Sequence, residues 1–340
     1  MTENLFAITA SQNYINQALE EAREVDKELK ILQNYGNGIL LAATKMEKLQ
    51  FNDAMLKKKP VFIRHISSFD MDVEIQTKGV AEIAKEVEKL PLKELSGKKV
   101  AVQIRKARGE YAFNPVDIKG EIDLLLTAQG AEAEIKEPQE IISLLLDENH
   151  CYIGLSAAKS NLSSWSGGML HYRKEDADIS RAKFKLMEAI EVFQLDLSGI
   201  RKALDLGAAP GGWTSVLLEK GVGVTAVDTG DMDPRLNKFK NYTYIKGNAS
   251  ELDLPKNSFD MLTSDISWNP KNTAQLVNHG ADFLRDGGLA VVTVKLMGTK
   301  VRRIIKEVKE IYQEVFDITE AKQLFHNRDE ITLVMRKRKS

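Results

Sequence analysis

Asp205-Leu206-Gly207-Ala208-Ala209-Pro210-Gly211-Gly212-Trp213 is the stretch of this 340-residue chain that decides the fold of its second half. It follows the strand-like residues 202–204 directly and leads into a helix-like run, residues 214–220. Small residues at the carboxyl end of a first strand let the backbone approach a bound ligand closely. A tight turn from strand to helix is the alternative. A proline inside the loop and a spacing that differs from G-x-G-x-x-G favour a specialised ligand loop over a dinucleotide loop.

Apolar runs and helical stretches alternate after this loop. The predicted strands are residues 202–207, 222–228, 242–248, 259–265, 288–296 and 330–338. The predicted helices are residues 214–220, 274–285 and 301–316. Strands spaced by helices predict an α/β fold with a mostly parallel sheet that is buried on both faces.

Two polar residues end the next two predicted strands. Asp228 stands seventeen residues after Gly211, and an acidic residue at about that distance typically binds the ribose hydroxyls of an adenosine cofactor. Asn248 ends the third strand, where its amide could read an adenine edge. We therefore expect an adenosine-containing ligand at this edge of the sheet.

The loop, with a following strand that ends in Asp, resembles the S-adenosylmethionine loop of FtsJ-type ribose 2′-O-methyltransferases. The resemblance implies a Rossmann-like class I methyltransferase domain over residues 173–340, with S-adenosylmethionine as cofactor. Many relatives carry Asp where this chain has Asn248. The implied cofactor residues are Ser180, Gly207, Ala209, Pro210, Gly211, Gly212, Trp213, Asp228, Asn248 and Asp265.

This family also uses a Lys-Asp-Lys-Glu constellation, and each member has a candidate here. Lys185 stands in Ser-Arg-Ala-Lys-Phe-Lys-Leu, although a solvated helix lysine is an equal alternative. Asp265 ends the fourth strand, where a helix cap is the competing interpretation. A charged Glu330 entering the last strand would usually be exposed.

Lys295 is the third member, and it ends an otherwise apolar strand. A lysine there is costly unless it has a function. Most FtsJ-type members would place their lysine at Thr293, but alternation puts Thr293 and Lys295 on one face of the strand. We therefore choose Lys295 as the base, with Lys185, Asp265 and Glu330 as orienting groups.

Three segments narrow the resemblance to the bacterial 23S rRNA cytidine 2′-O-methyltransferase subgroup. They are residues 180–186, residues 294–298 and the run Asn-Arg-Asp-Glu at 327–330. Met297-Gly298 departs from the subgroup, which has proline and methionine there, so the local loop shape is open. The implied partner is RNA, namely 23S rRNA or a pre-ribosomal particle.

The first half interleaves short strands and helices and predicts one or two α+β layers. Residues 99–113 combine Lys99, Arg105, Lys106 and Arg108 with Tyr111 and Phe113. Cations position a phosphate backbone and aromatic rings stack on bases, but a solvated strand edge with two core aromatics is as good an interpretation. The region 1–165 resembles a THUMP domain preceded by a ferredoxin-like piece, which implies RNA binding. Residues 160–172 are a connection between domains or a loop within one.

Composition excludes several classes of protein. There are 48 basic and 49 acidic residues, so a generally basic nucleic-acid binder is excluded. One cysteine suits a reducing cytosol, no run of about 20 apolar residues suggests a membrane helix, and we expect a cytoplasmic monomer without a metal. Cys151 lies in the wrong half for a cytosine C5-methyltransferase. An RNA-binding protein with a vestigial cofactor pocket and a nucleotide-dependent dehydrogenase remain as alternative functions.

Overall fold

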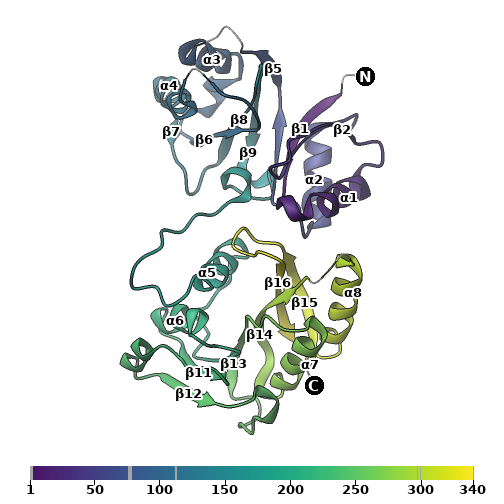
Figure 1. Cartoon of the computed structure of the whole chain (residues 1–340). Helices are drawn as coiled ribbons and strands as arrows, with labels where there is room; N and C mark the ends of the chain where they lie inside the picture. The colour runs from purple at the N-terminus through teal and green to yellow at the C-terminus, as the bar shows by residue number, and fades with distance from the viewer. Residues whose placement is uncertain (1–2, 76–78, 112, 297, 299, 340) are drawn as a thin grey trace. The chain divides into compact units, whose positions relative to one another are not determined.

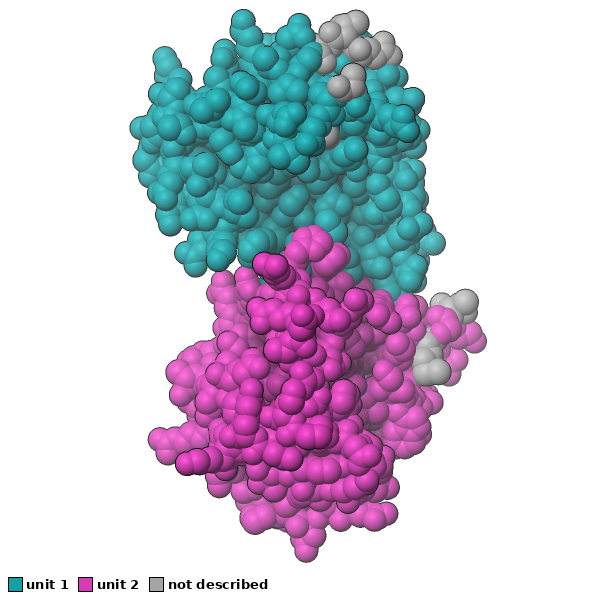
Figure 2. Space-filling view, turned by 60° about the vertical axis from the view of Figure 1, so that its left-hand side comes forward, with its two compact units in different colours: residues 1–170 teal, residues 171–340 magenta. Residues whose placement is uncertain are grey.

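The chain divides between Leu170 and His171 into two units, each with its own core (Figures 1 and 2). Unit 1 comprises residues 1–170 and unit 2 residues 171–340. The computed structural model describes residues 3–75, 79–111, 113–296, 298 and 300–339. The departure from the subgroup at Met297 lies outside these described residues.

Unit 1 begins with a four-stranded antiparallel sheet of order β2-β3-β1-β4. Its elements are β1 (Asn4–Thr9), α1 (Ile15–Val25), β2 (Lys30–Asn34), β3 (Ile39–Thr44), α2 (Lys48–Lys58) and β4 (His65–Phe69). This βαββαβ succession is the ferredoxin-like arrangement, so the expected α+β character is confirmed.

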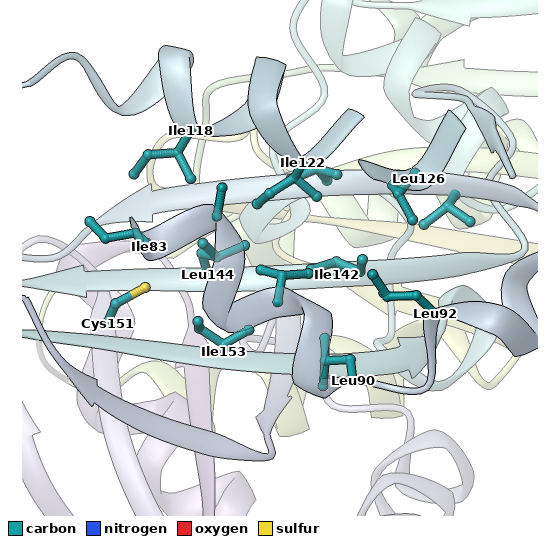
Figure 3. Packing of buried hydrophobic residues seen from close by; sticks show 14 of the residues in the cluster. Ile83, Leu90, Leu92, Ile118, Ile122, Leu126, Ile142, Leu144, Cys151 and Ile153 are labelled. Atoms are coloured by element: carbon teal, nitrogen blue, oxygen red, sulfur yellow. The ribbon is translucent and has the colours of Figure 1, made fainter. Parts of the chain in front are cut away.

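A second sheet, of order β5-β9-β8-β6-β7, completes unit 1. Its elements are β5 (Met71–Glu74), α3 (Val80–Glu86), β6 (Lys99–Lys106), α4 (Pro115–Ala128), β7 (Glu132–Ala133), β8 (Glu140–Asp147) and β9 (His150–Ala157). Helices α3 and α4 bury isoleucine and leucine side chains against this sheet (Figure 3). The thiol of Cys151 lies in this core, and burial raises its pKa, so it is an inert apolar side chain.

The two sheets of unit 1 meet through β4 and β9, where Phe69 and Tyr152 bring their rings to 5.7 Å. The segment that follows β9 packs back onto the same unit. Gln103 Nε2 donates to the carbonyl of Ser164 over 2.6 Å, and Thr9 Oγ1 donates to that of Gly167 over 3.1 Å. Residues 160–170 therefore belong to unit 1, and the boundary between the two units, after Leu170, falls inside the segment 160–172.

Unit 2 is built on a seven-stranded sheet of order β12-β11-β10-β13-β14-β16-β15. Its strands are β10 (Lys202–Leu206), β11 (Gly223–Asp228), β12 (Tyr242–Lys246), β13 (Phe259–Ser264), β14 (Leu284–Lys295), β15 (Phe316–Lys322) and β16 (Glu330–Lys337). Strand β16 runs antiparallel to both of its neighbours, and the other pairs are parallel. The expected mostly parallel, Rossmann-like sheet is confirmed.

Two pairs of helices cover the faces of this sheet. On one face, α5 (Lys183–Val192) and α6 (Gly212–Glu219) pack on side chains such as Ala203 and Met261. On the other face, α7 (Pro270–Gly280) and α8 (Val301–Tyr312) pair, and Gly280 approaches Leu206. No helix in the described part of the chain is long and apolar enough to cross a membrane.

Strand β15 was not predicted from the sequence. The predicted helix 301–316 ends at Tyr312, and Phe316 begins the strand instead. Tyr312 and Phe316 are both fully buried at a spacing of four, which imitates a continuing helical face. Pairing with β16, a contact that no local pattern reveals, decides the conformation here.

Gly154 of β9 offers a test of the contact between the two sheets of unit 1. A Cβ at this position would lie 2.0 Å from the carbonyl oxygen of Ser68 and 2.8 Å from Phe69 Cα. Because both obstacles are backbone atoms, Gly154→Ala should reduce the free energy of unfolding by about 2–3 kcal/mol in urea denaturation.

Gly120 is the matched control, since it lies exposed in α4 and a Cβ there would meet nothing within 4 Å. Gly120→Ala should stabilise the chain by about 1 kcal/mol, because alanine is the better helix former. Equal effects of the two substitutions would contradict the close approach of β4 and β9.

Candidate active site

The glycine loop lies at the carboxyl ends of β10 and β11. The amides of Gly207 and Ala208 both donate to the carbonyl of Val227, over 2.9 and 3.2 Å. Gly207 has φ of 70°, and a Cβ there would lie 2.2 Å from Ile266 Cγ1. Gly211 has φ of 112° and forms the N-cap of α6. These two positions require glycine, so the loop is a defined conformation that exposes backbone at the sheet edge.

Asp228 joins the glycine loop to the turn after β11. Its carboxylate accepts hydrogen bonds from Ala209 N over 2.9 Å and from Gly230 N over 2.7 Å. Each oxygen retains acceptor capacity for a second donor. A half-buried carboxylate beside a glycine loop at this edge fits the ribose diol of an adenosine cofactor.

A second carboxylate, Asp205, lies beneath the loop and is 1% exposed. It accepts hydrogen bonds from Thr214 Oγ1 over 2.6 Å and from Thr263 Oγ1 over 2.8 Å. Burial raises the pKa of Asp205 to about 6, although the two hydroxyl groups oppose this shift. Asp205 thus connects β10, α6 and β13 below the loop, a role that sequence reasoning missed.

The other predicted cofactor residues occupy different surroundings. Trp213 is 3% exposed and donates its indole N–H to Ala182 O over 2.9 Å. Ser180 accepts from Ala182 N over 3.2 Å, and its Cβ packs against Gly212. Asn248 is exposed and uses its side-chain oxygen to cap the turn at Ser250, which leaves its amide hydrogens available. The cofactor roles of these residues stay predictions.

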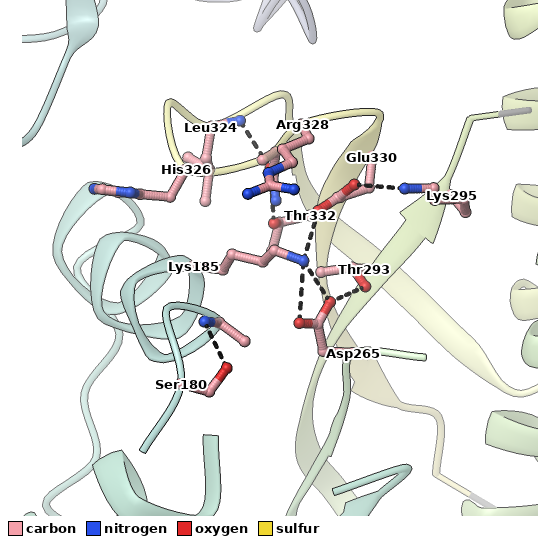
Figure 4. Close-up of polar contacts among 12 residues, drawn as sticks. Ser180, Lys185, Asp265, Thr293, Lys295, Leu324, His326, Arg328, Glu330 and Thr332 are labelled. Atoms are coloured by element: carbon pink, nitrogen blue, oxygen red, sulfur yellow. Dashed lines mark hydrogen bonds and ion pairs between the residues drawn. The ribbon is translucent and has the colours of Figure 1, made fainter. Parts of the chain in front are cut away.

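The four residues predicted to carry out chemistry lie together at the carboxyl edge of the sheet (Figure 4). Lys185 projects from α5, and its ammonium lies 3.0 and 3.1 Å from the two oxygens of Asp265. The same ammonium lies 2.5 Å from Glu330 Oε1. Helix α5 therefore inserts one cation between two carboxylates, one directly after β13 and one at the start of β16.

Lys295 and Glu330 are direct cross-strand partners in the β14–β16 pair. Lys295 Nζ lies 3.4 Å from Glu330 Oε2, the oxygen that Lys185 does not occupy. Thr293 lies two residues earlier on the same face and donates to Asp265 Oδ1 over 2.7 Å. Thr293 thus orients the aspartate, and Lys295 is the lysine that reaches the cluster, as in the choice made from alternation.

The charges within this cluster determine the protonation of its members. Burial alone would lower the pKa of Lys185, but Asp265 and Glu330 outweigh it and raise that pKa. Burial would raise the pKa of Glu330, but Lys185 outweighs it, so this pKa is lowered. Lys185 is consequently held as an ammonium, whereas the side chain of Lys295 is 30% exposed and meets a single carboxylate of the cluster.

Three cations of the basic segment 99–108 in unit 1 have partners within the protein. Arg108 lies 3.3 Å from Asp147, Lys99 lies 3.9 Å from Glu134, and Arg105 donates to the carbonyl of Ser166 over 3.4 Å. Tyr111 and Phe113 pack against the core. The two aromatic residues thus pack as core residues, whereas a role of the cations in RNA binding stays a prediction.

Part of the chain is similar to known proteins. Residues 179–337 match the FtsJ-like methyltransferase family. "Ribosomal RNA large subunit methyltransferase M" from Psychromonas ingrahamii is 34% identical over 205 residues, which are 56% of this chain and 55% of that protein. The protein of the same name from Marinobacter nauticus is 35% identical over 204 residues, again 56% of this chain and 55% of the relative. The chain spans about half the length of these curated relatives.

Among solved structures, TrmN from Thermus thermophilus aligns with 98% of this chain and 99% of its own length, at 14% identity. The TM-score of 0.41 is too low for this likeness to bear on fold or function.

Asp205 provides a test of the buried support beneath the loop. Its pKa is about 6 in the folded chain and about 3.9 in an unfolded one, so the folded state binds the extra proton between these values. Stability contributed by the protonated form should therefore be lost as the pH rises from about 4 to about 6, by up to about 3 kcal/mol. Asp205→Asn should flatten this part of the stability curve in urea denaturation.

Asp196→Asn is the control, because Asp196 is solvent-exposed and a hydrogen bond from Ser198 lowers its pKa. Its removal should change the curve little and with the opposite sign. A curve for Asp205→Asn that keeps the loss between pH 4 and 6 would show that Asp205 is not its source.

Proposed function

We propose that this chain, which carries an FtsJ-like methyltransferase domain, is an S-adenosylmethionine-dependent RNA ribose 2′-O-methyltransferase that acts on 23S rRNA, with a cytidine as the favoured target. The names of two relatives support the ribosomal substrate, and the matched residues make up 55% of each of these relatives. The observation that carries the proposal is the Lys185 ammonium between Asp265 and Glu330, with Lys295 on the remaining oxygen of Glu330.

The cofactor supplies a methyl group on a positively charged sulfur. The residues fit it, since the loop of Gly207 and Gly211 and the carboxylate of Asp228 meet at the same sheet edge as the four charged side chains. We expect Asp228 to hold the ribose hydroxyls and Asn248 to lie near the adenine.

We assign the role of proton acceptor in this cluster to Lys295. Lys185 is a fixed cation, because two carboxylates surround its ammonium. In its neutral form, Lys295 Nζ takes the proton of the ribose 2′-hydroxyl while that oxygen forms its bond to the methyl carbon. Held by the glycine loop and Asp228, the cofactor would supply this methyl group and would keep the electron pair of its carbon–sulfur bond. Asp265, Glu330 and Lys185 fix the geometry, and alignment of this kind contributes a large part of such a rate.

The partner and the state of the protein are part of the same proposal. RNA contacts would be local, because the chain as a whole carries a formal charge of −1. The THUMP-like character of unit 1 makes it the candidate for targeting, and we expect a cytoplasmic monomer. The FtsJ-like domain and the four assembled side chains favour this function over a vestigial RNA-binding protein or a dehydrogenase.

Lys295→Ala tests the base. Transfer of a methyl group to 23S rRNA should fall at least about 100-fold in kcat, because the proton acceptor is lost. The Kd of S-adenosylmethionine in calorimetry should stay within twofold. The unfolding midpoint should change little, since Lys295 is 30% exposed and lies 3.4 Å from a single carboxylate.

Two further variants serve as a control and a comparison for Lys295→Ala. Lys306→Ala, at a 78% exposed position of α8, should leave kcat unchanged. Lys185→Ala should lose activity, and its free energy of unfolding should fall by about 3–5 kcal/mol, because two buried carboxylates lose their counter-ion. Near-normal turnover by Lys295→Ala would exclude it as the base, and tight binding of NAD in place of S-adenosylmethionine would favour the dehydrogenase.

A further inference from the structure

Helix α5 carries a second buried charged residue one turn after Lys185. Glu188 is 1% exposed, and its spacing of three residues puts it on the same helix face as Lys185. Its Oε1 accepts a hydrogen bond from Phe325 N, and its Oε2 accepts one from His326 N, both over 2.7 Å. One carboxylate therefore binds two consecutive backbone amides of a segment far away in sequence.

Those amides belong to the connection between β15 and β16, residues 323–329, which we name the 323–329 loop. The loop is also ordered from within (Figure 4). Asn327 Oδ1 accepts from Leu324 N over 2.9 Å and from Thr332 Oγ1 over 3.0 Å. Gln323 Nε2 donates to the carbonyl of Asn327 over 3.1 Å.

The loop ends where the catalytic candidates begin. Glu330 follows it directly as the first residue of β16. The carbonyl of Asp329 accepts from Leu296 N over 2.7 Å, so the loop also contacts the residue after Lys295. A displacement of the loop would move Glu330 and Lys295 relative to Lys185.

We infer that Glu188 is a positioning residue, which fixes the 323–329 loop on α5 so that Glu330 lies between the ammonium groups of Lys185 and Lys295. This inference rests on the proposed function. The same helix supplies both anchors, since Lys185 binds the carboxylate of Glu330 and Glu188 binds the backbone just before it.

The choice of a carboxylate supports this role over simple packing. An ionised group that is 1% exposed costs free energy unless hydrogen bonds compensate it. Apolar contacts between the loop and α5 already exist, because the rings of Phe184 and His326 lie 5.3 Å apart. Packing alone would not require a carboxylate. Hydrogen bonds from two backbone N–H groups to one carboxylate fix both the position and the orientation of the loop on α5.

Glu188→Gln tests this inference. The amide group keeps the length of the side chain but opposes one backbone N–H with its own N–H. We expect amide exchange in the 323–329 loop to accelerate at least about tenfold, and kcat for rRNA methylation to fall about 10- to 100-fold. The Kd of S-adenosylmethionine should stay within twofold, because the glycine loop and Asp228 are not touched.

Glu191→Gln is the matched control on the same helix. Glu191 is exposed, and it accepts a hydrogen bond from the hydroxyl of Tyr172 over 3.1 Å. Neither exchange in the 323–329 loop nor kcat should change in this variant.

The two measurements separate this inference from the proposed function. Amide exchange needs neither substrate nor turnover, so it reports on the loop even if the wild-type chain does not methylate rRNA. Unchanged exchange in Glu188→Gln overturns the inference, and so does faster exchange with a kcat within twofold of the wild type. Should Glu188→Gln not fold, Glu188→Asp, which keeps the charge but shortens the reach, is held to the same two criteria.

Discussion

The ammonium of Lys185 between the carboxylates of Asp265 and Glu330 is the interaction on which unit 2 depends most. Two largely buried carboxylates at one sheet edge would repel each other and would be costly without a counter-ion. The cation comes from α5, the first carboxylate follows β13, and the second begins β16. The interaction therefore joins α5 to the carboxyl edge of the sheet, and it also brings the members of the reactive cluster together.

Strand register is what gives this cluster its geometry. Glu330 lies directly opposite Lys295 because β16 runs antiparallel to β14, and a slip of one residue would turn the carboxylate to the other face of the sheet. Thr293 and Thr332 are partners two residues further along and lie on the same face. One of them orients Asp265 and the other orders the 323–329 loop through Asn327.

Much of this arrangement could be predicted from the sequence. Apolar runs that end in small or acidic residues indicated the parallel strands, and the alternation of Thr293 and Lys295 placed both on one face. Strand β15 could not be predicted, because Tyr312 and Phe316 imitate a helix and pairing with β16 is a distant contact. Glu188 was missed for the same reason, since its backbone partners lie 137 and 138 residues away. The spacing of Glu188 from Lys185 on an apolar helix face is the one local signal that could have indicated it.

The near-neutral charge of the chain gains a physical explanation from the ion pairs. Many cations are matched locally by carboxylates, both in the basic strand of unit 1 and in the cluster of unit 2. In the proposed function, a few aligned groups select the RNA, rather than a general electrostatic attraction. The most direct test of the account is a map of ribose methylation in 23S rRNA from cells with and without the gene. We expect that one nucleotide, favoured to be a cytidine, loses its 2′-O-methyl group in the deletion strain and that Lys295→Ala does not restore it. An unchanged methylation map, or restoration of the mark by Lys295→Ala, would contradict it.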